Sequence, residues 1–333
     1  MSSSGVYILC HKADFRLTRG CCESIRRFAG DVPICLIVEG SFSTEALERQ
    51  YGCLTLRRED IKDERLRTKS FGGWGYSKMV AFWEGPFERF LYLDSDTIML
   101  GNVCAMAKEM PVDMIIPEVP ATLYQPDPMN VHWLNPEFVA RNFPSYRIYD
   151  HPYFTTGVFF GRKGLFDLGE YLRLLDLQRA HPNDSFRPVS GEQGLLNFLV
   201  FSAAAAGRLT YAVKPLQICP LYMEKGEVAE INEALRSTHD EWKGPRAVIH
   251  YVDVKPSLLH EGWARRSAAE VNGAWSPPPG WPTAMNKMRL QSYAACGYPH
   301  FAAMARVLAQ DLRYHGEALG KRLRSRLKSN ILC

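Results

Sequence analysis

At 333 residues, of which 46% are hydrophobic and 23% charged, the chain can bury a substantial core and is neither disordered nor fibrous. Its formal net charge is +4, but seven Lys and Arg against two acidic residues from Arg306 onward amount to +5, which leaves −1 for residues 1–305. The body of the protein is therefore close to neutral, and no nucleic-acid partner is expected.

The first part of the chain alternates short apolar runs with segments of helical spacing. The runs predict buried strands, and the segments between them predict helices. The expected strands are residues 6–10, 34–38, 53–56 and 90–93. The expected helices pass through residues 24–28, 44–51 and 77–83. This alternation is typical of a parallel, doubly wound α/β sheet.

The strand at 90–93 ends in two carboxylates, Asp94 and Asp96, with Ser95 between them. In open α/β sheets ligands gather at the carboxyl ends of the strands, and side chains two residues apart on an extended chain point the same way. The two carboxylates could therefore converge on one cation. The same residues are also ordinary turn and helix-cap residues, so the motif alone leaves both interpretations open.

Residues 10–14 follow the first strand and are expected at the same edge of the sheet as the carboxylates. A nucleotide is expected there, but the segment contains no glycine. It therefore matches neither the glycine-rich loop of a dehydrogenase nor that of a P-loop protein.

A further strand is expected at 113–116, followed by an irregular segment over 117–152 that predicts a lid or a recognition surface. Tyr124 and Trp133 within it are either platforms for a sugar or anchors of the loop to the core. Residues 153–160 predict a strand interrupted by small residues, and Gly157 there indicates the close approach of a ligand or another backbone.

The remaining elements are two helices, over 165–180 and from 190, and a short strand over 247–251. Ser190 and Gln193 form a capping-box pattern, which would explain Gln193 without any role in a site. The last strand ends near His250, and a lone histidine in such a place is usually a hydrogen-bonded core residue unless its partners make it a ligand.

The longest apolar stretches, such as residues 197–206, are too short to span a bilayer, and the first five residues lack the basic start of a secretory signal. None of the nine cysteines forms a Cys-x-x-Cys or a Cys/His metal spacing. We expect a cytoplasmic protein whose cysteines are mostly small buried hydrophobic residues.

Several of these segments match motifs of one enzyme family, in the same order along the chain. The segments are Tyr76-Ser77-Lys78, Leu93-Asp94-Ser95-Asp96-Thr97, Phe154-Thr155-Thr156-Gly157-Val158, Glu192-Gln193-Gly194-Leu195-Leu196-Asn197, and His250-Tyr251 followed by Lys255-Pro256. Together they resemble glycosyltransferase family 8, the glycogenin and bacterial galactosyltransferase group with the GT-A fold.

The resemblance implies a GT-A type α/β fold, with a doubly wound, mostly parallel sheet. Residues 1–105 would form the half that binds the nucleotide sugar, and residues 106–258 the acceptor and catalytic half of the same domain. Residues 259–333 would form a C-terminal helical region with a basic amphipathic tail. The implied activity is that of a hexosyltransferase-like enzyme, which moves a sugar from a nucleotide diphosphate sugar, a UDP-sugar, to an acceptor hydroxyl with retention of configuration.

The resemblance also implies roles for individual residues. Asp94, Asp96 and His250 would hold Mn²⁺, with Mg²⁺ as the alternative ion, because two carboxylates and one imidazole suit Mn²⁺ better. Catalytic roles fall on Gln193, Glu192 and Asp94. The donor-binding set is Cys10, Lys12, Lys78, Asp94, Ser95, Thr155, Thr156 and Lys255. Taken singly, Lys78 and Lys255 could each also be a solvated surface charge.

The sequence departs from the family at the loop after His250. Asp253 stands where the family usually has glycine, Lys255 comes one residue early, and Ser257 replaces a tryptophan. An acidic side chain near a diphosphate is unfavourable. Two alternatives therefore stay open, a GT-A-fold protein that binds nucleotide sugars with little or no turnover, and a nucleotidyltransferase on a similar sheet.

The C-terminal tail combines leucines at helical spacing with a cluster of basic residues. The leucines are Leu308, Leu312, Leu319, Leu323 and Leu327, and the basic residues are Arg313, Lys321, Arg322, Arg324, Arg326 and Lys328. Such a helix either packs on the body or lies on an anionic membrane surface. The second case would place the enzyme peripherally on the cytoplasmic face of the membrane, and a lipid-linked glycan would then join soluble carbohydrates as an acceptor.

Overall fold

The computed structural model describes residues 4–71, 73, 75–119, 133–181, 192–219 and 246–250. Within these ranges, no helix combines the length and the apolar character needed to cross a bilayer. Seven of the residues discussed above lie outside the described part, namely Tyr124, Ser190, Tyr251, Asp253, Lys255, Pro256 and Ser257, and so does the predicted C-terminal region 259–333.

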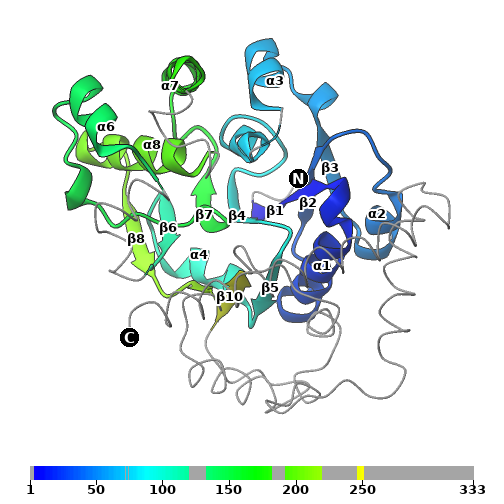
Figure 1. Cartoon of the computed structure of the whole chain (residues 1–333). Helices are drawn as coiled ribbons and strands as arrows, with labels where there is room; N and C mark the ends of the chain where they lie inside the picture. Colours follow the sequence, from blue (N-terminus) through cyan, green and yellow to red (C-terminus); the bar gives the residue numbers. More distant parts are fainter. Residues whose placement is uncertain are drawn as a thin grey trace, which may run out of the picture.

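The main sheet has seven strands in the order β3-β2-β1-β4-β7-β6-β8. The strands are β1 Ser4–His11, β2 Ile34–Glu39, β3 Leu54–Arg57, β4 Arg89–Leu93, β6 Met114–Pro117, β7 Val158–Arg162 and β8 Tyr211–Lys214. β7 runs antiparallel to β4 and β6, and the other pairs are parallel. The expected mixed α/β, mostly parallel sheet is confirmed (Figure 1).

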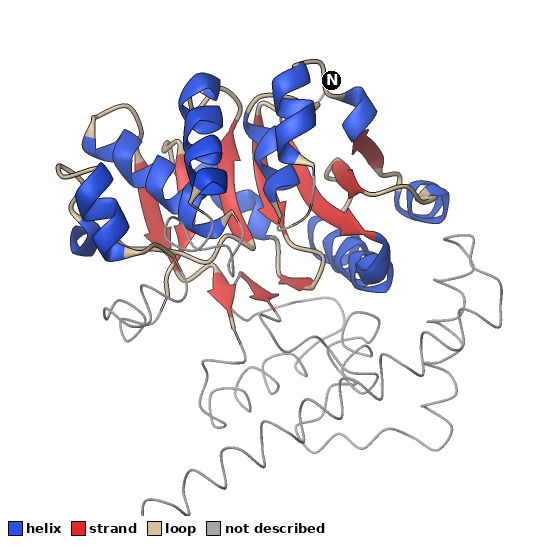
Figure 2. Ribbon diagram, turned by 45° about the horizontal axis from the view of Figure 1, so that its top comes forward, coloured by secondary structure: helices blue, strands red, loops and turns tan. Residues whose placement is uncertain are grey.

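Helices cover both faces of this sheet (Figure 2). The helices are α1 Phe15–Ala29, α2 Glu45–Tyr51, α3 Glu64–Ser70, α4 Met106–Glu109, α6 Pro136–Asn142, α7 Leu168–Ala180 and α8 Gln193–Ala205. The 3-10 helices are η1 Lys12–Asp14, η2 Arg58–Asp60, η3 Tyr76–Phe82, η4 Val103–Ala105 and η6 Ile148–Asp150.

Side chains of each strand alternate between two apolar clusters, because successive residues of a strand point to opposite faces. On β1, Tyr7 packs on the side of η3, α7 and α8, whereas Val6 and Ile8 pack on the side of α1 and α2. Both faces are therefore buried, which is why β1, β2 and β4 are continuous apolar runs in the sequence. The described cysteines are free thiols, and most of them are buried in these clusters, as expected.

A second, smaller sheet has the order β5-β10-β9. Its strands are β5 Thr97–Leu100, β9 Gln217–Ile218 and β10 Ala247–His250. β10 pairs antiparallel with β5, so that His250 lies opposite Thr97, and parallel with β9 on its other side. β5 and β10 lie together beneath the main sheet in Figure 1. This sheet brings a late part of the chain next to the Asp94–Asp96 turn.

The structure corrects several expectations about single elements. The helix expected at 77–83 is a 3-10 helix, the strand expected at 153–160 begins only at Val158, and α3 was not expected. The segment 117–152 was expected to be irregular, but it contains α6 and η6. Trp133 is fully buried and its Nε1 donates to the carbonyl oxygen of Phe154 at 3.0 Å. Its indole therefore anchors the loop, and its interpretation as a sugar platform is wrong.

Candidate functional site

The Asp94–Asp96 turn connects the two sheets at the carboxyl end of β4. β4 lies parallel to β1 with Leu93 opposite Ile8, so the two strands end at the same edge. The amide of Asp94 donates to the carbonyl of Gly157 at 2.8 Å, and the Thr97 hydroxyl donates to the carbonyl of Asp94 at 2.7 Å. The segment is thus a turn, as its composition allowed, and the turn holds both carboxylates at the sheet edge.

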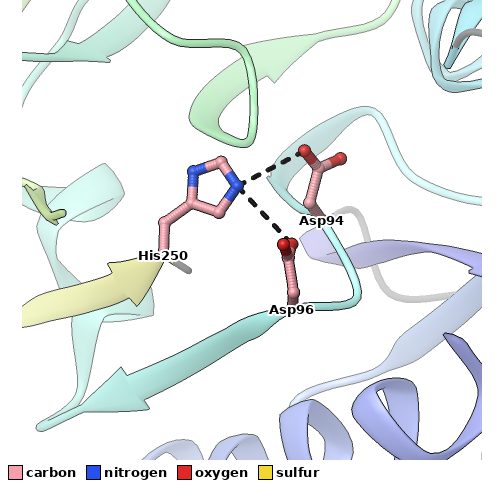
Figure 3. A group of neighbouring side chains, drawn as sticks. All are labelled: Asp94, Asp96 and His250. Carbon is pink, nitrogen blue, oxygen red and sulfur yellow. Dashed lines mark ion pairs between the residues drawn. The ribbon is translucent and has the colours of Figure 1, made fainter. Parts of the chain in front are cut away.

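Three potential ligands of a cation converge here, Asp94, Asp96 and His250 (Figure 3). The Nε2 atom of His250 lies 3.6 Å from Asp94 Oδ2 and 3.5 Å from Asp96 Oδ1. One ligand atom from each residue lies within 4.8 Å of the others. Asp96 and His250 are buried, while Asp94 is partly exposed, so the site is reached from the Asp94 side. Two hard oxygen ligands with one imidazole fit a divalent cation such as Mn²⁺.

Gly157 makes room for the imidazole of His250. A Cβ atom on Gly157 would overlap the ring of His250. The sequence predicted the close approach of a ligand or another backbone at Gly157, but in the structure the group that approaches it is the His250 side chain. The glycine is therefore needed for a histidine of the second sheet to reach the end of the main sheet.

The other ring nitrogen of His250 contacts a residue that the sequence did not single out. His250 Nδ1 lies 3.2 Å from Oε1 of Gln217, on β9. The amide nitrogen of Gln217 donates to the Thr155 hydroxyl at 2.6 Å and also contacts Cys219 Sγ. Only the pairing of β9 with β10 places Gln217 beside His250, and no local sequence pattern contains that pairing.

Lys78 lies at the centre of a buried ionic network beside the three ligands. Its Nζ atom is 2.5 Å from Glu192 Oε1 and 3.2 Å from Asp94 Oδ1, and it donates to the carbonyl of Thr156 at 3.2 Å. Burial alone would lower the pKa of Lys78, but the carboxylates of Asp94 and Glu192 outweigh it and hold the pKa above its ordinary value. Lys78 is only 3% exposed, so the alternative of a solvated surface charge is wrong.

Glu192 is buried opposite Lys78. It accepts a hydrogen bond from the Thr156 hydroxyl at 2.6 Å, and its side chain is 6% exposed. Burial raises the pKa of Glu192, and the charge of Lys78 opposes this rise. Gly75 has a positive φ of 76°, and a Cβ atom there would meet the Glu192 carboxylate. The glycine therefore allows η3, which carries Lys78, to begin against Glu192.

Gln193 is the first residue of α8, and Glu192 is the N-cap residue. The capping-box pattern of Gln193 begins at Ser190, which lies outside the described residues, so that interpretation stays a prediction. The Oε1 atom of Gln193 accepts a hydrogen bond from the amide of Thr156 at 3.3 Å. Gln193 thus faces the Thr155-Thr156 segment, alongside the Lys78 network.

Asp94 joins the network to the cation site. Its Oδ1 atom accepts a hydrogen bond from the Tyr92 hydroxyl at 2.6 Å and pairs with Lys78, while Oδ2 faces His250. Burial and the nearby Asp94 charge raise the pKa of Tyr92, so Tyr92 stays a neutral donor. One carboxylate is therefore oriented by Tyr92 and Lys78 toward the place where a cation would bind.

The remaining predicted donor-binding residues lie around this group. Thr155, Thr156 and Ser95 are buried beside it, and Lys12 is in η1 after β1. Cys10 is fully buried in the apolar cluster on the α1 side, near the end of β1.

A cavity of about 1020 Å³ opens along the same sheet edge, at the carboxyl ends of β1, β2 and β3. Its lining includes His11, Glu39, Arg57, Arg58 and Gly75. The Glu39 carboxylate accepts hydrogen bonds from the amide of Gly73 and, at 2.9 Å, from the hydroxyl of Ser77. Through Gly75 the cavity reaches the neighbourhood of Glu192 and Lys78.

No protein-family model matches the chain, and no curated protein matches it in sequence. Among solved structures, the bifunctional glycosyltransferase WbbM in its apo form is 12% identical, with a TM-score of 0.52 over 86% of this chain and 52% of that one. Mouse xyloside xylosyltransferase 1 in its apo form is 16% identical, with a TM-score of 0.46 over 76% of this chain and 99% of that one. The galactosyltransferase LgtC in complex with donor and acceptor sugar analogs is 12% identical, with a TM-score of 0.48 over 83% of this chain and 98% of that one.

At these identities the comparisons show the fold alone. The match to WbbM and the strand order of the main sheet assign the chain to the GT-A type of glycosyltransferase fold. The expected fold class is thereby confirmed, while the narrower assignment to family 8 stays a prediction.

Proposed function

We propose that the protein is a metal-dependent glycosyltransferase that moves a sugar from a nucleotide diphosphate sugar to an acceptor hydroxyl. The convergence of Asp94, Asp96 and His250 at the carboxyl edge of a GT-A type sheet carries this proposal. These three residues would hold a divalent cation, Mn²⁺ before Mg²⁺. Such a cation neutralises the negative charge that develops on a departing nucleoside diphosphate.

The donor is a nucleoside diphosphate sugar, and UDP-sugars are the first to test. The cavity at the ends of β1, β2 and β3 supports this placement, because it offers room for a nucleoside at the same edge of the sheet. Lys12, Ser95 and Asp94 would lie along the nucleotide. Cys10, near the end of β1, would also contact the nucleotide. Lys255 would add positive charge to the diphosphate from outside the described residues.

The sugar of the donor would lie against the Lys78 network. Glu192, Thr155 and Thr156 offer oxygen atoms to its hydroxyls, and Lys78 sets the charge of that surface. The Oε1 atom of Glu192 already pairs with Lys78 and accepts a hydrogen bond from Thr156. This oxygen is therefore poorly suited to form a bond to carbon. We therefore place Gln193 near the anomeric carbon and favour front-face transfer with retention, in which the diphosphate oxygen helps to take the proton of the incoming hydroxyl.

Gln193→Ala tests the role of this side chain. Removing its side-chain amide takes away the acceptor of the Thr156 N–H, so the melting temperature should fall by only about a few degrees. Donor hydrolysis should fall more than about tenfold, since positioning of reacting groups is lost. Equal rates for the variant and the wild type would remove Gln193 from the mechanism.

The proposed function is tested by a thermal-shift screen of nucleotide sugars with Mn²⁺, followed by hydrolysis of the donors that bind. One or more nucleotide sugars should raise the melting temperature only with Mn²⁺, and Asp96→Asn or His250→Ala should abolish this response while the fold is kept. Binding without hydrolysis or transfer would favour a nucleotide-sugar-binding protein instead. Release of pyrophosphate from a nucleoside triphosphate would favour a nucleotidyltransferase.

The acceptor is a carbohydrate or a lipid-linked glycan, and we place the enzyme in the cytoplasm. The basic tail supports peripheral contact with an anionic membrane, because each basic residue at such a surface contributes on the order of 1 kcal/mol. A chain ending at Gln310 should lose flotation with anionic vesicles and keep donor hydrolysis. If the full-length protein does not float at low salt, a soluble acceptor replaces the lipid-linked one.

A further inference from the structure

Gln217 connects two groups of residues that the proposed function uses separately. On one side its carbonyl oxygen faces His250, a predicted ligand of the cation. On the other side its amide nitrogen donates to Thr155, a predicted donor-binding residue. β9 is only two residues long, and its pairing with β10 sets Gln217 opposite Val248, two residues before His250.

The orientation of the Gln217 amide determines the tautomer of His250. In the structure its nitrogen faces the Thr155 hydroxyl at 2.6 Å and Cys219 Sγ, and its carbonyl oxygen faces the imidazole. A carbonyl oxygen only accepts hydrogen bonds, so Nδ1 of a neutral His250 must carry the proton. The lone pair of Nε2 then points toward Asp94 and Asp96, as a ligand of a cation requires.

The contacts of Gln217 close a ring around the site. From His250 the ring passes through Gln217 to Thr155, along the chain to Thr156, and by hydrogen bond to Glu192. From Glu192 it returns through Lys78 and Asp94 to His250. A change at the Gln217 amide therefore acts on both the cation ligands and the segment next to the proposed sugar position.

We infer that Gln217 is the positioning residue of the cation site. It holds the neutral His250 ring in the Nδ1–H tautomer and fixes the ring against Thr155, so that Nε2 faces the two carboxylates before any cation binds. The inference rests on the proposed function, because the cation site is part of that proposal. Partners of this kind typically change metal affinity by about 10–100-fold when they are mutated.

The first experiment reads the tautomer directly and needs neither cation nor turnover. Two-bond ¹H–¹⁵N spectra of the full chain with labelled histidine, recorded above neutral pH and assigned with His250→Asn, report which ring nitrogen carries the proton. Wild type should show His250 protonated at Nδ1 only, and Gln217→Leu should shift the ring toward the other tautomer. A His250 ring protonated at Nε2 in wild type, or an unchanged spectrum in Gln217→Leu, would overturn the inference.

The second experiment measures Mn²⁺ affinity by electron paramagnetic resonance of free Mn²⁺. Gln217→Leu should raise the Kd about 10–100-fold, and Gln217→Glu, which keeps an acceptor for Nδ1–H, should stay within about tenfold of wild type. Ile218→Val is the control for damage to β9, because Ile218 pairs with Ile249 in β10. This variant should bind Mn²⁺ as tightly as wild type does.

The outcomes separate the two proposals. If wild type binds Mn²⁺ and Gln217→Leu binds it equally tightly, the role of Gln217 is overturned and the cation site stands. If wild type binds no Mn²⁺, the proposed function fails at its cation site. Equal weakening in Gln217→Leu, Gln217→Glu and Ile218→Val would assign the effect to the strand and would also overturn the inference.

Discussion

Lys78 carries its charge in a place that is almost closed to water. A buried ion loses several kcal/mol of hydration, which only close partners of opposite charge and hydrogen bonds offset. Lys78 has both, since Asp94 and Glu192 supply the charge and the Thr156 carbonyl accepts a further hydrogen bond. The residue is therefore part of the fold as well as of the candidate site.

Removing this charge should destabilise the protein strongly. Lys78→Met leaves the buried Glu192 without its counter-ion, and we expect the free energy of unfolding in urea to fall by about 3–5 kcal/mol. Adding Glu192→Gln removes the uncompensated charge and should restore part of the loss. If the single variant is as stable as wild type, the ion pair is not a significant part of the folding energy.

The sequence predicts only part of the candidate site at this scale. Asp94, Asp96 and Lys78 could be found because they stand in short motifs at the ends of recognisable elements. The contacts of Lys78 with Glu192 and of His250 with Gln217 are between residues far apart in the chain, and no local spacing contains them. Gln217 could not be found at all, since a single glutamine in a two-residue strand has no pattern of its own.

At the scale of elements, two glycines at β7 make room for neighbouring side chains, one at the candidate site and one in the core. Gly157, just before β7, faces His250, whereas Gly161 within β7 faces the rings of Phe82 and Phe90. The two positions allow the same substitution to be compared in two surroundings.

Gly157→Ala should abolish the rise in melting temperature that Mn²⁺ causes, because the added methyl group occupies the position of the His250 ring. Gly161→Ala is the matched control. It should cost about 1–3 kcal/mol of stability through overpacking against the aromatic rings and keep the response to Mn²⁺. Loss of the response in both variants would show that it depends on the strand as a whole.

The start of α3 is held by two acidic side chains. Glu84 accepts hydrogen bonds from the amides of Lys62 and Asp63, each at 2.8 Å, and Asp63 accepts from the amides of Arg65 and Leu66. The bond from the Arg65 side chain, followed by that from the Leu66 amide, lowers the pKa of Asp63 to about 2. Leu66 is the one apolar residue of α3, which explains why hydrophobic periodicity did not reveal this helix.

The charge of Asp63 at this cap contributes to the stability of the fold, and the direction in which this contribution changes with pH is determined. A carboxyl whose folded pKa lies below its unfolded value of about 3.9 stabilises the fold above that value and loses the contribution as the pH falls toward about 2. Asp63→Asn keeps a capping oxygen without the charge, so its deficit against wild type should shrink over this interval. Asp63→Ala should cost about 1 kcal/mol at neutral pH. Urea unfolding of the three proteins across this pH range measures both effects, and a constant deficit for Asp63→Asn would exclude a role for the charge.

For the whole molecule, most strands of the main sheet and β10 of the second sheet could be predicted, whereas β8, β5 and β9 could not. The strands β1, β2 and β4 are buried on both faces, so continuous apolar runs reveal them regardless of their partners. β5 and β9 exist only because β10 lies between them, and β10 comes from a distant part of the chain. Pairing between strands so far apart in the chain depends on the tertiary structure. The sequence could therefore indicate His250 as a ligand, but it could not indicate that β9 lies beside the strand that bears it.

The three candidate ligands also divide between the sheets. Asp94 follows β4 of the main sheet, whereas His250 ends β10 of the second sheet, 154 residues after Asp96. A bound cation would thus act as a removable cross-link that closes a long loop of the chain. Its effect on unfolding follows from mass action, about 2.7 kcal/mol when the cation is present at 100 times its Kd.

We therefore expect Mn²⁺ to slow amide hydrogen exchange in β10 and β5, and a chelator to reverse this. Exchange in β1 and β2 should change less, because these strands are held by the main sheet on both sides and by helices on both faces. Equal slowing in all four strands would mean that the cation stabilises the molecule only globally. Selective slowing would mean that the cation controls when the strand bearing His250 is released from β5.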